Sequence, residues 1–307
     1  MTTVPTRADV EAAAARLAGL LPHTPLIDGR SLPAQLKCEL FQRTGSFKAR
    51  GALNRVLQLT PEERERGVIA ISAGNHAAAI AFAAAQVGVD ALVVMWQGAS
   101  EQKIESTRRY GGTVDLAAHD PAGAFERLHT LIAETGRVLV HPFDDPVVIA
   151  GAGTVGLEIE ADAPDADAVV VAVGGGGLVS GIQTALAGRI RVIAVEPERS
   201  RALHDGLAAD AAVRVSCDSI ADGLNAPFAG AIALEVCRDI ERVLVTEAEI
   251  ADAFRLLHER AKLAVEPAGA AALAAVVAGK VEARNPVVVV SGGNVARHTA
   301  SAILAAR

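Results

Sequence analysis

A lysine in an unusual local setting is the first candidate for chemistry. It lies in the segment Thr44-Gly-Ser-Phe-Lys-Ala-Arg-Gly51, where small residues, a hydroxyl and an aromatic ring surround Lys48. An apolar setting disfavours the charged form of a lysine and leaves an amine that can act as nucleophile or base. We therefore predict that Lys48 is a placed amine rather than a solubilising charge.

A run of four glycines predicts a phosphate site. Gly174, Gly175, Gly176 and Gly177 follow the apolar run that ends at Val173 and precede a helical pattern. Without Cβ atoms, successive N–H groups can turn into one concavity, and the start of a helix adds positive potential. The run lacks a P-loop lysine and does not have the Gly-x-Gly-x-x-Gly spacing.

Two further turns present polar side chains after apolar runs. In the first, Ser72, Asn75 and His76 lie beside Gly74 at the start of a helical pattern, which suits an anion such as a carboxylate. The same turn also fits a helix cap with a hydrogen-bonded histidine. The second turn, Ser291-Gly-Gly-Asn294, fits a binding turn and a structural turn equally well.

These four places together predict one ligand. A lysine, a phosphate cradle, an anion-binding turn and a further hydroxyl can surround a phosphorylated aromatic aldehyde. Pyridoxal phosphate is such a compound, and it forms a Schiff base with a lysine while the protein orients its ring. We therefore predict pyridoxal phosphate as the cofactor.

A different Gly-x-Gly-x-x-Gly match supports an alternative cofactor. It is Gly151-Ala-Gly-Thr-Val-Gly156, which follows Asp-Asp-Pro rather than a strand pattern. Residues 168–195 contain no acidic side chain that could bind a ribose. Close helix packing is therefore the favoured interpretation, and an NAD-dependent dehydrogenase remains an alternative.

Short apolar runs alternate with helical patterns along most of the chain. This alternation is typical of parallel sheets covered by helices, and it predicts an α/β fold with two parallel or mostly parallel open sheets. A helix over 47–59 would place Lys48 in its first turn. The expected strands are 37–41, 68–71, 91–95, 114–116, 138–140, 168–173, 191–195, 242–245 and 287–290, and the other expected helices include 8–20, 75–87, 100–110 and 121–135.

Composition excludes several classes of function. The net charge is −7 with no long basic run, so nucleic acid is not an expected partner. Cys38, Cys217 and Cys237 fit neither a disulfide framework nor a thiolate metal site, which indicates a reducing compartment. The first twenty residues include charged side chains, so no signal peptide is expected. The longest apolar run is too short to span a bilayer, and we expect a cytoplasmic protein without a membrane partner.

Several segments in order resemble the fold type II pyridoxal-phosphate enzymes, and within them the serine/threonine dehydratase and serine racemase group. The resemblance covers nearly the whole chain, from Pro22 to Asn294. It depends on the four places described above and on four further segments: His141-Pro-Phe-Asp-Asp-Pro146, Val195-Glu-Pro197, Ala221-Asp-Gly223 and Glu266-Pro-Ala-Gly269.

The resemblance implies a role for each candidate residue. Lys48 would hold the cofactor as a Schiff base and, once released, would remove the Cα proton of the substrate. The cofactor would be held by Phe47 beside its ring, Asn75 at its ring hydroxyl, Gly174, Gly175, Gly176 and Gly177 at its phosphate, Ser291 at its pyridine nitrogen, and by Gly223 and Glu266. The substrate carboxylate would be bound by Ser72, Gly74, Asn75 and His76.

The resemblance also implies an activity and an organisation. The expected reaction converts L-threonine, L-serine or a related β-hydroxy amino acid to a 2-oxo acid and ammonia. A serine racemase or a β-replacement synthase is the alternative with the same cofactor, and a non-catalytic sensor is a further one. We expect a homodimer, with a large cofactor-binding domain (1–57 and 142–307) and a small substrate-gating domain (58–141).

Some positions depart from the family pattern. Similar racemases have a second serine where this chain has Ala73, so a racemase with two bases is disfavoured. Similar dehydratases usually have glutamine at Ala78 and proline at Trp96, which leaves the substrate side chain open.

A divalent cation site of some family members is incomplete. It uses a glutamate, a carbonyl four residues on and an aspartate six residues on, which correspond to Glu196, Ser200 and Ala202. Because Ala202 has no carboxylate, we predict no metal. Allosteric dehydratases of the family carry a C-terminal regulatory domain, and none is expected after Arg307.

Overall fold

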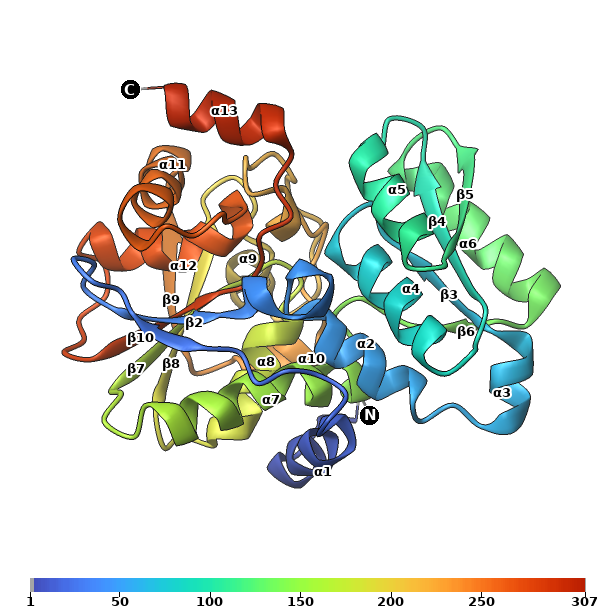
Figure 1. Cartoon of the computed structure of the whole chain (residues 1–307), viewed down its shortest axis with the longest axis horizontal. Coiled ribbons are helices and arrows are strands. Elements are labelled where there is room, and N and C mark those ends of the chain that lie inside the picture. Colours follow the sequence, from blue (N-terminus) through green and yellow to red (C-terminus); the bar gives the residue numbers. More distant parts are fainter. Residues whose placement is uncertain (1–2, 307) are drawn as a thin grey trace.

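The structure, a computed structural model, describes residues 3–306. Two sheets lie in separate lobes with helices on their faces, and α2 (Lys48–Val56) lies between the lobes (Figure 1). The other α-helices are α1 (Arg7–Leu17), α3 (Pro61–Arg66), α4 (Asn75–Gln86), α5 (Glu101–Arg109), α6 (Pro121–Thr135), α7 (Pro146–Asp162), α8 (Gly177–Leu186), α9 (Ala202–Ala209), α10 (Ala231–Val236), α11 (Glu247–Leu256), α12 (Pro267–Val277) and α13 (Arg297–Ala305). The strands are β1 (Leu26–Asp28), β2 (Gln35–Cys38), β3 (Val68–Ile71), β4 (Ala91–Trp96), β5 (Thr113–Ala118), β6 (Val138–Leu139), β7 (Ala168–Ala172), β8 (Arg191–Pro197), β9 (Glu241–Val245) and β10 (Pro286–Val290).

Both sheets are parallel or mostly parallel. The larger one has six strands in the order β1-β2-β10-β7-β8-β9, and within it β1 pairs antiparallel with β2. The smaller one has four parallel strands in the order β5-β4-β3-β6. The predicted α/β fold with two helix-covered sheets is confirmed.

The central strands of the larger sheet are apolar on both faces. All residues of β7 and β10 are buried, and Val287 of β10 pairs in register with Val169 of β7. A parallel sheet with helices on both faces requires such strands, because neither face meets water. Valine suits this setting, since β-branched side chains pack well on a pleated surface.

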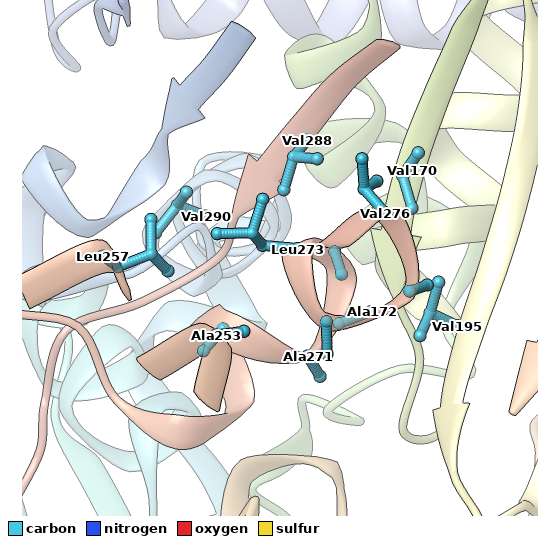
Figure 2. Close-up of a cluster of buried hydrophobic side chains, with 14 of the residues drawn as sticks. Val170, Ala172, Val195, Ala253, Leu257, Ala271, Leu273, Val276, Val288 and Val290 are labelled. Atoms are coloured by element: carbon cyan, nitrogen blue, oxygen red, sulfur yellow. The ribbon is translucent and has the colours of Figure 1, made fainter. Parts of the chain in front are cut away.

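One face of the larger sheet is covered by an alanine-rich helix. Figure 2 shows Leu273 and Val276 of α12 beside Val170 and Val288 of the sheet. Alanine side chains let the helix axis approach the strands closely, so few aromatic residues are needed to fill this core. The helix is apolar on all sides because α11 covers its other face (Figure 1).

Glycines allow α7 and α8 to pack in contact. A Cβ atom added to Gly153 of α7 would lie 2.6 Å from the carbonyl oxygen of Gly181 in α8. The Gly151–Gly156 segment lies inside α7 and not between a strand and a helix. The interpretation of these glycines as close helix packing is confirmed.

The sequence predictions were wrong in a few segments. The strand expected over 37–41 ends at Cys38, and Glu39–Phe41 form a 3₁₀ turn (η1), which brings the buried carboxylate of Glu39 to Arg50. Strand β1 is short and only partly buried, so it gives little periodicity. Within residues 3–306, no helix is both long and apolar enough to cross a membrane.

Candidate active site

A cavity of about 1060 Å³ lies between the two lobes. The carboxyl ends of β3, β4, β6, β7 and β10 open into it, as do the first turns of α2, α4 and α8. Ligands of open parallel sheets bind outside the carboxyl ends of the strands, and helix starts favour anions there. Every residue predicted for the site lines this cavity: Phe47, Lys48, Ser72, Gly74, Asn75, His76, Gly174, Gly175, Gly176, Gly177, Gly223, Glu266 and Ser291.

Lys48 is the first residue of α2 and is fixed from both sides. The N–H of Phe47 donates to the carbonyl oxygen of Ser291 at 3.1 Å, which ties the start of α2 to the end of β10. The Nζ atom of Lys48 donates to the carbonyl oxygen of Pro142 at 2.7 Å and lies 5.0 Å from the centre of the Phe47 ring. The amine is therefore held between the two lobes.

The amine of Lys48 is easier to deprotonate than that of an ordinary lysine. Burial lowers the pKa of Lys48 to about 8. Among residues 3–306, no carboxylate forms an ion pair with this amine that would restore its charge. A neutral lysine amine near physiological pH is the form that attacks an aldehyde or removes a proton.

The glycine run forms a backbone cradle at the start of α8. Gly176, the N-cap residue, has φ of 93°, a conformation that favours glycine. A Cβ atom on Gly175 would lie 2.3 Å from the ring of Phe143, and one on Gly176 would lie 2.3 Å from Cβ of Ala233. The first N–H groups of α8 have no partner within the helix and are available to a phosphate.

The turn after β3 presents several donors. The hydroxyl of Ser72 accepts a hydrogen bond from the N–H of Gly74 at 3.1 Å, which leaves the Ser72 O–H free to donate. Asn75 and His76 are the first residues of α4, so their backbone N–H groups lack intrahelical partners. The start of α4 therefore fits a carboxylate.

The ring of His76 is neutral and has a fixed orientation. Its Nε2 atom lies 2.9 Å from the carbonyl oxygen of Val140, so Nε2 carries the hydrogen. Burial, assisted by the positive charge of Lys48, lowers the pKa of His76 to about 3. Its buried Nδ1 atom has no partner among the described residues and can only accept. An anion at this turn would therefore be bound by the backbone N–H of His76 and not by its ring.

Asn75 connects the smaller sheet to a buried carboxyl group of the larger lobe. Its Nδ2 atom donates to Oε1 of Glu266 at 2.6 Å. Burial, with a smaller contribution from the charge of Asp222, raises the pKa of Glu266 to about 7. Gly223 packs against Ala268 beside this carboxyl group, since a Cβ atom on Gly223 would lie 3.0 Å from that of Ala268.

Several cavity residues had no predicted role. Pro142 and Phe143, which contact Lys48 and the glycine cradle, lie in the segment 141–146 that supports the family resemblance without a predicted function of its own. Lys103 of α5 forms an ion pair with Asp222 in the 3₁₀ turn η3 (Asp222–Leu224), and both line the cavity. Nothing in their spacing indicates this contact, because they lie 119 positions apart along the chain.

The residues around Glu196 do not fit a divalent cation. Both oxygens of its carboxylate accept backbone N–H groups at the start of α9, from Leu203 at 2.7 Å and His204 at 2.9 Å. Ala202, the first residue of α9, supplies no second carboxylate. Among residues 3–306, no group of three or more His, Cys, Asp or Glu side chains is arranged to hold a metal ion.

The cavity residues do fit pyridoxal phosphate. A backbone cradle that a Cβ atom would fill suits the phosphate, and a partly buried amine with a lowered pKa suits the aldehyde. The start of α4 provides a separate place for the carboxylate of an amino acid. The two anion sites and the amine belong to a single cavity.

Sequence relatives of known activity match most of the chain. The L-threonine ammonia-lyase of Thermotoga maritima is 44% identical over 267 residues, which cover 85% of this chain and 67% of that one. A catabolic L-threonine dehydratase of Staphylococcus aureus is 40% identical over 305 residues, with 94% of this chain and 88% of that one covered.

Solved structures also match over nearly the whole length. Maize serine racemase has a TM-score of 0.90 at 34% identity, covering 97% of this chain and 96% of that one. The serine racemase of Dictyostelium discoideum has a TM-score of 0.88 at 33% identity, covering 96% and 100%. A threonine deaminase from T.th. has a TM-score of 0.88 at 38% identity, covering 95% and 99%. Residues 18–293 match the family described as pyridoxal-phosphate dependent enzyme. The chain therefore belongs to the pyridoxal-phosphate-dependent enzymes of this fold.

Proposed function

We propose that the protein is an ammonia-lyase that converts L-threonine, L-serine or a related β-hydroxy amino acid to a 2-oxo acid and ammonia. The observation that carries the proposal is the partly buried amine of Lys48, with its lowered pKa, in one cavity with the glycine cradle and the start of α4. The names and identities of the threonine ammonia-lyase and dehydratase relatives support the choice of substrate.

Lys48 moves the proton that starts the reaction. When bound, pyridoxal phosphate takes up the amino group of the substrate and delocalises the electron pair left at Cα. The released amine of Lys48 is neutral in a useful fraction at physiological pH, so its Nζ atom accepts the Cα proton. Phe47 lies against this amine and limits the water around it.

The turn after β3 holds the substrate by its carboxylate. The N–H groups of Asn75 and His76 and the hydroxyl of Ser72 point a set of donors at one anion. Holding the carboxylate fixes the orientation of the substrate at Cα. Neutral His76 adds no positive charge, so Lys48 remains the group that exchanges protons.

Ser291 favours elimination over transamination. We propose that its neutral hydroxyl faces the pyridine nitrogen, where a carboxylate would strengthen the electron sink. With the weaker sink, the electron pair at Cα expels the β-hydroxyl group, which takes up one proton and leaves as water, so that together with the proton that Lys48 removed from Cα one molecule of water is lost. Hydrolysis of the resulting enamine then consumes one water and releases ammonia, so threonine gives 2-oxobutanoate and ammonia.

The similarity to maize serine racemase raises a second candidate function. Racemisation needs a group on each face of the substrate to exchange the Cα proton. Ala73 has no such group at the position where similar racemases carry a serine. We therefore propose elimination as the main activity.

Incubation with hydroxy amino acids tests the proposal. The purified protein is mixed with threonine, serine or 3-hydroxyaspartate. The release of 2-oxo acid is measured with a coupled dehydrogenase that reduces it. Release from at least one of them supports the proposal, and chiral chromatography measures any D-isomer. A protein that releases no 2-oxo acid from any of the three is not the proposed lyase.

The rate of cofactor uptake should depend on the protonation of Lys48. We expect the rate at which the apo-protein combines with pyridoxal phosphate to rise with pH, with a midpoint near 8, because only the neutral amine attacks the aldehyde. Stopped-flow absorbance from roughly pH 6 to 10 measures this midpoint, and a midpoint near the ordinary lysine pKa of about 10.4 would contradict burial of the amine.

We propose that residues 58–141 gate the substrate. The ion pair between Lys103 of α5 and Asp222 of the larger lobe supports this role, because it links the two sides of the cavity. An exposed pair contributes less than about 1 kcal/mol, so Lys103→Ala should raise KM about twofold to fivefold with little change in kcat. Asp222→Ala and the double variant should show the same rise in KM. If the two single increases in KM multiply in the double variant, the two residues do not act as a pair.

We further propose a cytoplasmic homodimer. The three cysteines are free thiols, and two of them, Cys38 and Cys237, are buried, which suits a reducing compartment. The exposed ring of Phe41 offers an apolar contact for a second subunit. Light scattering after gel filtration measures the mass, and a monomer at micromolar concentration would contradict the dimer.

A further inference from the structure

Asn294 lies outside the cavity but contacts a residue inside it. It follows the Ser291-Gly-Gly turn after β10, and it is absent from the residues that line the cavity. Its Nδ2 atom donates to Oδ1 of Asn75 at 2.8 Å and to the carbonyl oxygen of Thr44 at 2.7 Å. Asn294 therefore connects the turn before Lys48 to the start of α4.

The orientation of the Asn294 amide is fixed by a backbone carbonyl. The oxygen of Thr44 can only accept, so the amide must turn its Nδ2 toward it. The opposite orientation would bring the Asn294 oxygen against two acceptors, the carbonyl oxygen of Thr44 and Oδ1 of Asn75. Gly45 secures the position, because a Cβ atom there would lie 2.5 Å from Oδ1 of Asn294.

The unusual backbone of Thr44 belongs to the same arrangement. Thr44 is buried and has φ of 62° and ψ of 7°, a left-handed conformation that a β-branched residue rarely adopts. Such a conformation costs on the order of 1–3 kcal/mol and persists only where neighbouring contacts require it. Here it directs the Thr44 carbonyl group to Asn294.

Asn294 in turn fixes the amide of Asn75. Because Nδ2 of Asn294 donates to the Asn75 oxygen, the Asn75 nitrogen must face the other way, where it donates to Glu266 at 2.6 Å. The opposite orientation would set donor against donor at Asn294, and it would also set acceptor against acceptor at Glu266 when that carboxyl group is ionised. The second hydrogen on Nδ2 of Asn75 has no partner among residues 3–306 and remains available at the cavity wall.

We propose that Asn294 is a positioning residue that turns the amide of Asn75 so that a hydrogen-bond donor, and not an acceptor, faces the ring hydroxyl of pyridoxal phosphate. The family resemblance implies that Asn75 faces that hydroxyl, and the role of Asn294 rests on that placement and on the proposed function. A donor stabilises the hydroxyl in its ionised form, whereas an acceptor would repel it. The carbonyl group of Thr44 orients the amide of Asn294, and Asn294 in turn orients the amide of Asn75.

Cofactor titration of variants tests this role. Apo-protein carrying Asn294→Asp, Asn75→Ala or both is titrated with pyridoxal phosphate, and the dissociation constant is read from the visible absorbance. Asn294→Asp replaces the donor with an acceptor of the same shape, and we expect a loss of affinity of about fivefold to tenfold, the value of one hydrogen bond. The double variant should bind no more weakly than Asn75→Ala alone, because both changes act through one amide.

Controls separate positioning from folding. Asn285→Asp changes an exposed amide away from the cavity and should keep the wild-type dissociation constant. If Asn294→Asp fails to fold, as judged by circular dichroism of the apo-protein, Asn294→Ser removes the amide donors without adding charge and should show the same loss. A wild-type dissociation constant in a folded Asn294 variant, or losses that multiply in the double variant, overturns the proposal. An unchanged constant in Asn75→Ala would instead show that Asn75 does not face the cofactor, while 2-oxo acid release by the wild type tests the lyase function separately.

Discussion

Lys48→Ala should abolish the visible absorbance of the protein and lower the rate of 2-oxo acid release by on the order of 10⁴-fold. Alanine removes the only group at this position that can bind the aldehyde covalently. It also removes the amine that we propose as the base for the Cα proton. Two functions are lost in one substitution, so the effect should be the largest of any single change in the cavity.

Matched variants show whether the loss is chemical. Lys280→Ala removes another lysine, one that pairs with Glu249 outside the cavity, and should keep both absorbance and rate. Lys48→Arg keeps a positive charge but supplies no amine that forms a Schiff base, so it should be as inactive as Lys48→Ala. A variant without Lys48 that still releases 2-oxo acid at a rate near the wild type would show that another group is the base.

The part of the site that could be predicted from sequence consists of short turns whose residues are neighbours along the chain. The glycine run, the turn at Ser72 and the turn at Ser291 each follow a strand that is wholly or mostly buried. The parallel order of the strands then brings their carboxyl ends to one cavity. Alternating apolar runs and helical patterns indicate parallel strands, so the fold class and the meeting of these segments at one cavity could be predicted, whereas the strand order could not.

Contacts between side chains far apart in the sequence could not be predicted. The hydrogen bond from Asn294 to Asn75 joins residues 219 positions apart, and no local pattern marks either partner for the other. The orientation of His76 is a similar case, since it depends on the carbonyl oxygen of Val140. Only the folded backbone decides which nitrogen of the ring is free.

A buried charge network behind Lys48 was also absent from the sequence predictions. Arg50, near the start of α2, is 3% exposed and forms two hydrogen bonds with the carboxylate of Glu39, each of 2.8 Å. It also contacts Glu158 of α7 at 2.6 Å, and Glu158 pairs with the fully buried Lys37 of β2 at 2.7 Å. The network fixes the helix that carries Lys48 against the larger sheet.

Arg50→Met should lower the free energy of unfolding by about 3–5 kcal/mol, because it leaves the buried carboxylate of Glu39 without its counter-charge. Domains of this kind are stable by only about 5–15 kcal/mol, so the loss is a large fraction of the total. Urea unfolding of the apo-protein, followed by circular dichroism, measures it. Arg238→Met removes a solvent-exposed pair with Asp210 and should cost less than about 1 kcal/mol.

A double variant and a pH series identify the cause of this loss. Arg50→Met combined with Glu39→Met should be more stable than Arg50→Met alone, because no unpaired charge remains at Glu39. Burial by itself would raise the pKa of Glu158, but Arg50 and Lys37 lower it to about 2. A carboxyl group with a lowered pKa stabilises the fold above its unfolded value of about 4.3, and that contribution disappears as the pH falls through the folded value. The difference between wild type and Arg50→Met should therefore be constant from roughly pH 6 to 8 and shrink below pH 4, whereas a loss caused only by packing would stay the same at every pH.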